Sequence, residues 1–180
     1  IPALVLKKCA AELSAPLTRL YRLSYDSGTV PDTWREANVQ PIPKKGDRSD
    51  PNNYRPIAIT SVLCKVMERI INTKLIRYLE DHSLISDRQY GFRPNRSTGD
   101  LLGYILHHWG EVMDKHGEVL AVSLDMAKAF DRVWHRGLLS KLPSYGLPDK
   151  LCDWISGFLD SRKIRILVDG QESDLLPVNS

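Results

Sequence analysis

Apolar positions recur at steps of three and four residues over several long stretches of the chain, which is the period of an amphipathic helix. Helices with this pattern are predicted at residues 3–25, 62–80, 97–115, 136–142 and 148–160. Pro16 lies inside the first stretch and predicts a bend or a break there. Gly28 and Pro31 are expected to end that helix, because neither residue favours its continuation.

Extended stretches lie between these helices. Residues 37–43 and 55–60 predict two strands joined by a loop rich in Pro, Gly, Asn and Ser, so we expect a hairpin with a basic tip. The prolines of the first strand favour an edge position, because proline donates no backbone hydrogen bond. Two further strands, 163–168 and 173–178, are joined by the turn signal Asp169-Gly170.

One apolar run stops abruptly at a carboxylate. Residues 119–124 read Val-Leu-Ala-Val-Ser-Leu and predict a strand, which Asp125 follows directly. An acid at the end of an apolar strand is a common way to hold a metal ligand at a sheet edge. The alternative is a core strand whose first turn residue is Asp, since Asp favours turns and helix caps. Phe130 follows five residues later and would lie beside whatever such a metal holds.

Asp131 is a poor partner for Asp125 at one pair of metal ions. Six residues place the two side chains about 120° apart around a helix, or about 20 Å apart along a strand. The ions of a two-metal site are only about 3.5–4 Å apart. We therefore expect Asp131 to brace the turn before Trp134, and a two-metal site would need a carboxylate from elsewhere.

Composition narrows the class of protein. The chain has 180 residues, 42% of them hydrophobic and 26% charged, which is typical of a folded globular protein rather than a disordered one. Its three dispersed cysteines fit neither a disulfide framework nor a zinc site and suit a reducing compartment. No apolar run reaches the roughly 20 residues of a membrane span, and the P-loop spacing is absent. The chain begins without Met, as a piece of a longer polypeptide would.

The net charge of +3 is too small to indicate a nucleic-acid partner by itself, but basic residues gather at the predicted hairpin. Lys44 follows Pro43 at the end of one strand, and Arg55 precedes Pro56 at the mouth of the other. Two cations on paired strand ends can clamp a polyphosphate, because the planar fork of Arg matches phosphate oxygens. The alternative is ordinary solvated surface charge.

Aromatic, amide and guanidinium side chains alternate in the connection before the third helix. The set consists of Gln89, Tyr90, Phe92, Arg93 and Arg96. Such a set can follow a single nucleic-acid strand by stacking on its bases and contacting its phosphates. An equally good interpretation is that the aromatic side chains anchor the loop by packing.

Several segments, taken in order, resemble the reverse transcriptase of LINE-type (non-LTR) retrotransposons of the jockey-like group. They lie at residues 31–35, 41–47, 53–57, 89–93, 97–98 and 124–133. Each segment alone is a weak signal, whereas their order and spacing together are specific. The resemblance implies an α+β fold of the right-hand polymerase type: a fingers region at about 1–117 and the start of the palm at about 118–180, truncated before the Tyr-x-Asp-Asp hairpin.

The resemblance also implies roles for individual residues. Asp125 is similar to the first catalytic aspartate of the palm, which binds two Mg²⁺ (or Mn²⁺) ions with help from the backbone carbonyl of Met126. Phe130 matches the aromatic that rejects a 2′-hydroxyl on the incoming dNTP. Lys44 and Arg55 match the residues that hold its triphosphate. Residues 89–96 would lie along the template path.

The resemblance implies addition of dNTPs to a primer 3′-hydroxyl on an RNA template. The Tyr-x-Asp-Asp sequence that supplies the remaining carboxylate does not occur in these 180 residues, so we expect no polymerisation from this piece alone. Its implied partners are an RNA template, a DNA primer, dNTP and the rest of the element's polyprotein (endonuclease, remaining palm and thumb), with no membrane.

The implied location is intracellular, in nucleus and cytoplasm, as a ribonucleoprotein. Two alternatives remain: a non-catalytic nucleic-acid-binding remnant, and a fragment similar to a group II intron maturase. An exposed sheet edge also predicts poor solubility of the isolated piece.

Overall fold

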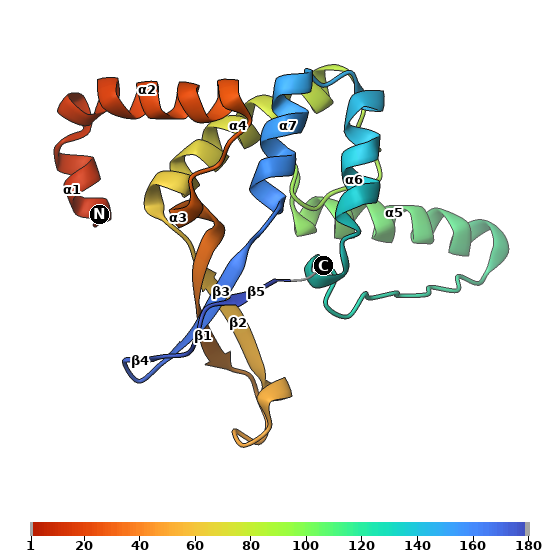
Figure 1. Ribbon diagram of the computed structural model, residues 1–180. Coiled ribbons are helices and arrows are strands. Elements are labelled where there is room, and N and C mark those ends of the chain that lie inside the picture. The colour runs from red at the N-terminus through yellow and green to blue at the C-terminus, as the bar shows by residue number, and fades with distance from the viewer. Residues whose placement is uncertain (1, 179–180) are drawn as a thin grey trace. The chain divides into compact units, whose positions relative to one another are not determined.

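The computed structural model describes residues 2–178, apart from the side chain at position 116, and forms two compact units. The first unit comprises Ile1–Ile70 together with Phe130–Ser180, and the second comprises Ile71–Ala129. Figure 1 labels the elements of both units. The sequence indicated no internal boundary of this kind. The expected division into fingers and palm near residue 117 is a functional one and stays a prediction.

The first predicted helical stretch forms two helices, α1 (Ala3–Lys8) and α2 (Ala10–Ser27). The break falls at Cys9, whereas Pro16 lies inside α2, so the break expected near the proline is displaced toward the N-terminus. Proline fits within α2 because its fixed φ is close to the helical value, although it removes one backbone hydrogen bond. Gly28 ends α2 in the left-handed conformation, with φ at 64°, as the sequence predicted.

The sheet lies in the first unit and has the strand order β2-β1-β3-β4, with β5 also paired to β3. The predicted hairpin is confirmed: β1 (Glu36–Pro43) and β2 (Tyr54–Ile59) pair antiparallel. β3 (Lys163–Val168) pairs parallel with β1. The last predicted strand, 173–178, is formed only at β5 (Leu176–Pro177), and a short strand that was not predicted, β4 (Gln171–Glu172), precedes it. Asp169 and Gly170 form the turn with positive φ values of 49° and 80°.

The edge position expected for the first strand is wrong only at Asn38 and Val39, where β1 has a partner strand on both sides. Glu36 to Val39 pair with β3 on one side, while Asn38 to Pro43 pair with β2 on the other. Pro41 and Pro43 therefore lie beyond the segment that pairs with β3. The prolines occupy the half of β1 that has one partner strand, which is where a missing N–H donor costs least.

The core of the first unit forms where α2 packs against α7 (Asp149–Leu159). Trp154 is 2% exposed, and its indole Nε1–H donates to the Ser24 hydroxyl at 3.1 Å. That hydroxyl donates in turn to the Thr29 carbonyl at 2.7 Å. Gly157 lies where the helices meet, because a Cβ at this position would be 2.6 Å from the Gly28 carbonyl oxygen. The remaining elements of this unit are α3 (Asp32–Arg35), η1 (Pro51–Asn53), η2 (Phe130–Arg132), α6 (His135–Lys141) and η3 (Leu142–Tyr145).

Two long helices match the predicted ones closely. α4 (Val62–Asp81) begins in the first unit and ends in the second, and α5 (Thr98–His116) lies in the second. Ser97 caps α5 through a reciprocal pair of hydrogen bonds with Asp100, which satisfies two backbone N–H groups of the first turn. No helix in residues 2–178 combines the length and the apolar character needed to cross a bilayer.

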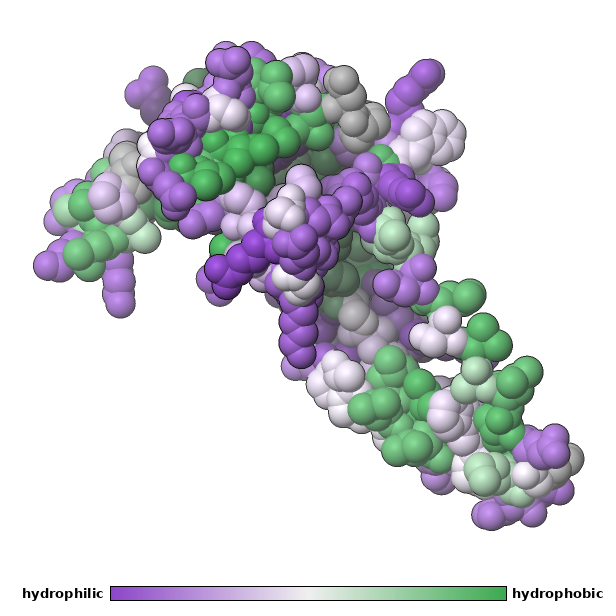
Figure 2. Space-filling model, turned by 90° about the horizontal axis from the view of Figure 1, so that it is seen from below, coloured by the Kyte–Doolittle hydropathy of each residue, from purple (hydrophilic) through white to green (hydrophobic). Residues whose placement is uncertain are grey.

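The strand expected at residues 119–124 is not formed. Residues 118–126 are described as an exposed segment outside helices and strands, in which Leu120 is 92% and Leu124 90% exposed. A strand needs a neighbour to satisfy its backbone N–H and C=O groups, and none of the described strands pairs with this segment. Figure 2 shows apolar side chains at the surface of the part formed by α5 and this segment.

Candidate functional site

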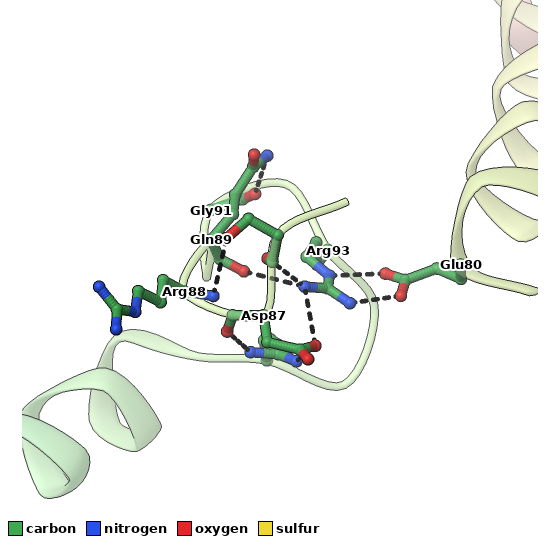
Figure 3. A network of polar contacts seen from close by, with 8 residues as sticks. Glu80, Asp87, Arg88, Gln89, Gly91 and Arg93 are labelled. Carbon is green, nitrogen blue, oxygen red and sulfur yellow. Dashed lines mark hydrogen bonds and ion pairs between the residues drawn. The ribbon is translucent and has the colours of Figure 1, made fainter. Parts of the chain in front are cut away.

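The loop between α4 and α5 is built around one buried guanidinium (Figure 3). Arg93 donates from Nε and Nη2 to the two carboxylate oxygens of Glu80, at 2.7 and 2.5 Å. Its Nη1 also donates to the Ser86 carbonyl at 2.7 Å. The Arg93 side chain is only 6% exposed, so this guanidinium lies inside the loop rather than on its surface.

A second arginine closes the same loop. Arg96 donates to both the backbone carbonyl and the carboxylate of Asp87, the latter at 3.1 Å. The Arg96 guanidinium also lies over the Tyr90 ring, 5.1 Å from its centroid, which is a favourable cation–π distance. The loop is therefore held by two arginine–carboxylate pairs, and both guanidiniums are engaged within the protein.

The side chains predicted to meet nucleic acid thus divide into two kinds. Arg93 and Arg96 hold the loop together, in addition to any contact that they make with a ligand. Phe92 is 86% exposed and has a positive φ of 60°, so it does not anchor the loop by burial. Gln89 is exposed, and its side-chain amide donates to the Gly91 carbonyl at 3.3 Å. The polar network, rather than packing of the aromatic rings, is what orders this loop.

Ion pairing shifts the pKa values of Glu80 and Arg93. The hydrogen bond from Arg93 lowers the pKa of Glu80 below its ordinary value, and the same bond raises the pKa of Arg93. Both shifts favour the charged forms. The pair is therefore fully ionised at neutral pH, and it weakens only as the pH falls through the lowered pKa of Glu80.

The β1–β2 hairpin brings the two predicted phosphate-binding cations together. Arg55 pairs with Ile42 across the hairpin, and the Lys44 N–H donates to the Asn53 carbonyl at 2.6 Å, which continues the same register. Side chains directly opposite each other lie on one face, and residues two apart along a strand share that face. Lys44 and Arg55 are therefore diagonal neighbours on the same face of the hairpin, and both are exposed.

The tip of this hairpin is ordered by its own polar side chains. Asp47 accepts hydrogen bonds from the Ser49 backbone N–H at 2.9 Å and from its hydroxyl at 2.7 Å, and these bonds lower the pKa of Asp47. The Tyr54 hydroxyl donates to the Arg48 carbonyl at 2.9 Å. The Lys44 ammonium donates to the Asn52 carbonyl at 3.2 Å. These bonds define the shape of the loop next to the two cations.

The remaining predicted site residues are described in separate units. Asp125 and Met126 lie in the second unit, on the exposed segment that forms no strand, and Met126 is 71% exposed. Phe130 begins η2 in the first unit and is 78% exposed. The hairpin with Lys44 and Arg55 also belongs to the first unit. The grouping of these residues into one site stays a prediction.

The described residues do not make up a complete two-metal centre by themselves. Within residues 2–178 no three His, Cys, Asp or Glu side chains gather as a ligand set. Mg²⁺ in enzymes is commonly bound through one or two carboxylates plus substrate phosphates, whereas Asp125 stands on an exposed segment with no strand to fix it. The predicted metal role of Asp125 and Met126 stays a prediction.

Glu80 and Asp87 are the residues that sequence reasoning missed. Glu80 lies near the end of a predicted helix, 13 positions before Arg93, where it looks like one of many solvated acids. No local spacing predicts this pairing, because it depends on how the loop folds back against the helix. The Ser97–Asp100 cap, by contrast, follows a spacing that the sequence displays.

Both a protein family and individual known proteins that resemble this chain are RNA-directed DNA polymerases. Residues 42–178 match the family described as reverse transcriptase (RNA-dependent DNA polymerase). The RNA-directed DNA polymerase from mobile element jockey of Drosophila melanogaster is 32% identical over 163 residues, which are 90% of this chain and 18% of that protein. The probable RNA-directed DNA polymerase from transposon BS of the same organism is 33% identical over 145 residues, covering 77% of this chain and 15% of that protein.

A different type of element gives a similar match. The retrovirus-related Pol polyprotein from type-1 retrotransposable element R2 of Popillia japonica is 32% identical over 143 residues, 78% of this chain and 19% of that protein. The chain thus spans less than a fifth of the length of each of these three relatives.

Proposed function

Because this chain belongs to the reverse transcriptase family, we propose that it is the part of an RNA-directed DNA polymerase that holds the template strand and the triphosphate of the incoming dNTP. The resemblance to non-LTR retrotransposon enzymes and the α+β class that it implied are both confirmed. The observation that carries the proposal is the placement of Lys44 and Arg55 on one face of an ordered hairpin.

The proposed nucleotide contact follows from charge and geometry. Two cations that share a face give a local positive field for a polyphosphate, and the Arg55 fork can bind two phosphate oxygens at once. The Lys44 ammonium, which donates to the Asn52 carbonyl, adds a second positive charge next to it. The loop at residues 89–96 is proposed to lie along the template, with exposed Phe92 stacking on a base.

The chemistry proposed for the whole enzyme is nucleotidyl transfer. The primer 3′-oxygen forms a bond to the α-phosphorus of the dNTP, and the bond from that phosphorus to the leaving pyrophosphate breaks. In the longer polymerase, Asp125 and the Met126 carbonyl would be ligands of Mg²⁺ or Mn²⁺, whose role is to activate the hydroxyl and neutralise the leaving group. Phe130 would lie beside the sugar of the dNTP.

A matched pair of variants tests the nucleotide contact. Lys44→Ala removes one of the two cations on the shared face, while Lys45→Ala removes a neighbouring charge that lies beyond the last backbone hydrogen bond of the hairpin, between Lys44 and Asn53. Binding of radiolabelled dTTP at low salt, measured by equilibrium filtration, should weaken about tenfold for Lys44→Ala, as expected for loss of a charged hydrogen bond. Equal losses in both variants would show only non-specific attraction and would refute the assignment.

A primer-extension assay tests the proposal that the isolated chain is inactive. The 180-residue chain, an RNA template, a labelled DNA primer and dNTPs with Mg²⁺ should give no extended product, because the sequence holds no Tyr-x-Asp-Asp carboxylates. Extension by the wild-type chain that disappears in Asp125→Asn would overturn this expectation.

A non-catalytic nucleic-acid-binding role is the second candidate. It is favoured by the exposed Phe92 on an internally clamped loop, since single-strand binding needs such a surface irrespective of catalysis. The two candidates differ in dNTP binding, which only a polymerase requires. Weaker binding of dTTP by Lys44→Ala than by Lys45→Ala therefore favours the polymerase.

A further inference from the structure

The loop between α4 and α5 holds two residues in a backbone conformation that side chains disfavour. Phe92 has φ at 60° and Asn95 has φ at 59°. For Asn the left-handed region is common, whereas for a bulky aromatic residue it is a real outlier. Such conformations persist only where the surrounding structure holds them, and they cluster at ligand-binding sites. Phe92 therefore needs a local restraint.

That restraint is next to Phe92 in the chain. Arg93 is clamped by both oxygens of the Glu80 carboxylate and by the carbonyl groups of Ser86 and Gln89, at 2.7 and 3.4 Å (Figure 3). The bidentate geometry fixes the plane of the guanidinium as well as its position. Because Glu80 belongs to the long helix α4, the clamp ties the backbone at Arg93 to a rigid element.

The result of this clamp is an outward-facing aromatic ring. Phe92 is 86% exposed while its neighbour Arg93 is almost fully buried. Phe92 also lines a cleft of about 600 Å³ together with Pro94, Ile76 and Arg77. An exposed ring at the rim of a largely apolar cleft is suited to stacking on a flat, unpaired base, since every nucleobase presents a π-face.

We propose that Glu80 is a positioning residue, which clamps Arg93 so that Phe92 is held outward as a stacking platform for an unpaired base of single-stranded nucleic acid. The proposal rests on the proposed function of this loop as a template contact. The same pairing neutralises the Glu80 carboxylate, so that an acid beneath the platform does not repel the phosphates of the strand. Asp87 has the equivalent relation to Arg96.

The test compares two neighbouring carboxylates on α4. Glu80→Gln breaks the bidentate clamp, whereas Asp81→Asn breaks an exposed pair with Arg77 at 3.6 Å. Because Asp81 lines the same cleft as Glu80 and Phe92, this variant removes an equal negative charge at the cleft but leaves the clamp in place, and it serves as the matched control. Hydrogen exchange of peptides covering residues 87–96 reports order in the loop without any ligand. Anisotropy of a fluorescein-labelled single-stranded oligo(U) reports binding by the full 180-residue chain.

We expect loop amides to exchange about tenfold faster in Glu80→Gln, the loss expected for a charged hydrogen bond, with no change in Asp81→Asn. RNA affinity should fall about tenfold in Glu80→Gln. It should fall by a similar factor in Phe92→Ala, because this substitution removes the ring on which a base stacks and leaves the Glu80–Arg93 clamp in place. Exchanging the two charges, in the double variant Glu80→Arg with Arg93→Glu, should restore part of the RNA affinity lost in either single charge variant.

The possible outcomes distinguish failure of the Glu80 clamp from failure of the template contact on which it rests. If the wild-type chain does not bind the oligonucleotide, the template role of the loop is refuted, and the stacking platform with it. If wild-type RNA binding is intact but Glu80→Gln binds equally well, the clamp is merely structural and this proposal alone is overturned. Unchanged loop exchange in Glu80→Gln would also overturn it.

Discussion

The close approach of α2 and α7 gives a sharp prediction for one glycine. Replacing Gly157 by Ala places a methyl group 2.6 Å from the Gly28 carbonyl oxygen, an atom of the backbone that cannot rotate away. Relieving the contact requires the two helices to separate, which also stretches the hydrogen bond between Trp154 and Ser24. Gly157→Ala should therefore destabilise the first unit.

The magnitude follows from two opposing terms. Overpacking typically costs about 1–3 kcal/mol, and a 2.6 Å contact with a backbone atom belongs to the upper part of that range, at about 2–3 kcal/mol. Ala in place of Gly inside a helix recovers about 1 kcal/mol. The net destabilisation is about 1–2 kcal/mol. For a unit of this size that corresponds to a fall in Tm of about 4–8 °C.

The matched control is a helical glycine with free space around it. A Cβ at Gly103 in α5 would meet no other atom within 4 Å, so Gly103→Ala should be neutral or stabilising. Thermal unfolding followed by near-ultraviolet circular dichroism measures both variants. If Gly157→Ala melts at or above the wild-type temperature, as the control does, the helices do not approach as described and the reasoning is refuted.

Three further predictions concern a thiol, a helix cap and the exposed apolar segment. Burial and the hydrogen bond to Glu68 raise the pKa of Cys64 to about 12. At pH 8 iodoacetamide should therefore modify the exposed Cys9 well before Cys64, as measured by mass spectrometry. Equal rates of modification would contradict the burial of Cys64. Ser97→Ala should destabilise the first turn of α5 by about 0.5–2 kcal/mol, seen as faster amide exchange. Because hydrogen bonds from Ser97 lower the pKa of Asp100, the contribution of Asp100 to that cap should be present above the ordinary pKa of Asp, about 3.9, and be lost as the pH falls below it. If the exchange rates in this turn, corrected for the intrinsic pH dependence of amide exchange, do not change over this range, the prediction is wrong. Leu124→Lys should reduce aggregation in dynamic light scattering, since Leu124 is 90% exposed, and unchanged particle size would show that this segment does not drive association.

Local signals predicted most of the elements. The helical period and the caps located α4, α5 and α7 closely, because a helix satisfies its backbone within one segment. The hairpin followed from turn residues between two extended runs. The break at Cys9 was displaced from its expected place, since a proline inside a helix weakens it without obliging it to end there.

Features that depend on distant residues could not be predicted in the same way. Whether residues 119–124 form a strand is decided by the presence of a partner strand, which no local pattern reveals. The pairing of Glu80 with Arg93 depends on the path of the intervening loop. The shared face of Lys44 and Arg55, in contrast, follows from the alternation of side chains once the hairpin register is known. Periodicity therefore predicts elements and faces, while long-range pairing requires the structure.

The central claim is that the loop at residues 89–96 contacts the template. Crosslinking with a single-stranded RNA that carries 4-thiouridine, followed by mass spectrometry of the digested 180-residue chain, tests it most directly. We expect crosslinked peptides that contain Tyr90 or Phe92, and fewer of them in Glu80→Gln than in Asp81→Asn. Efficient crosslinking confined to other segments, such as α2 or α7, would contradict a template contact by this loop.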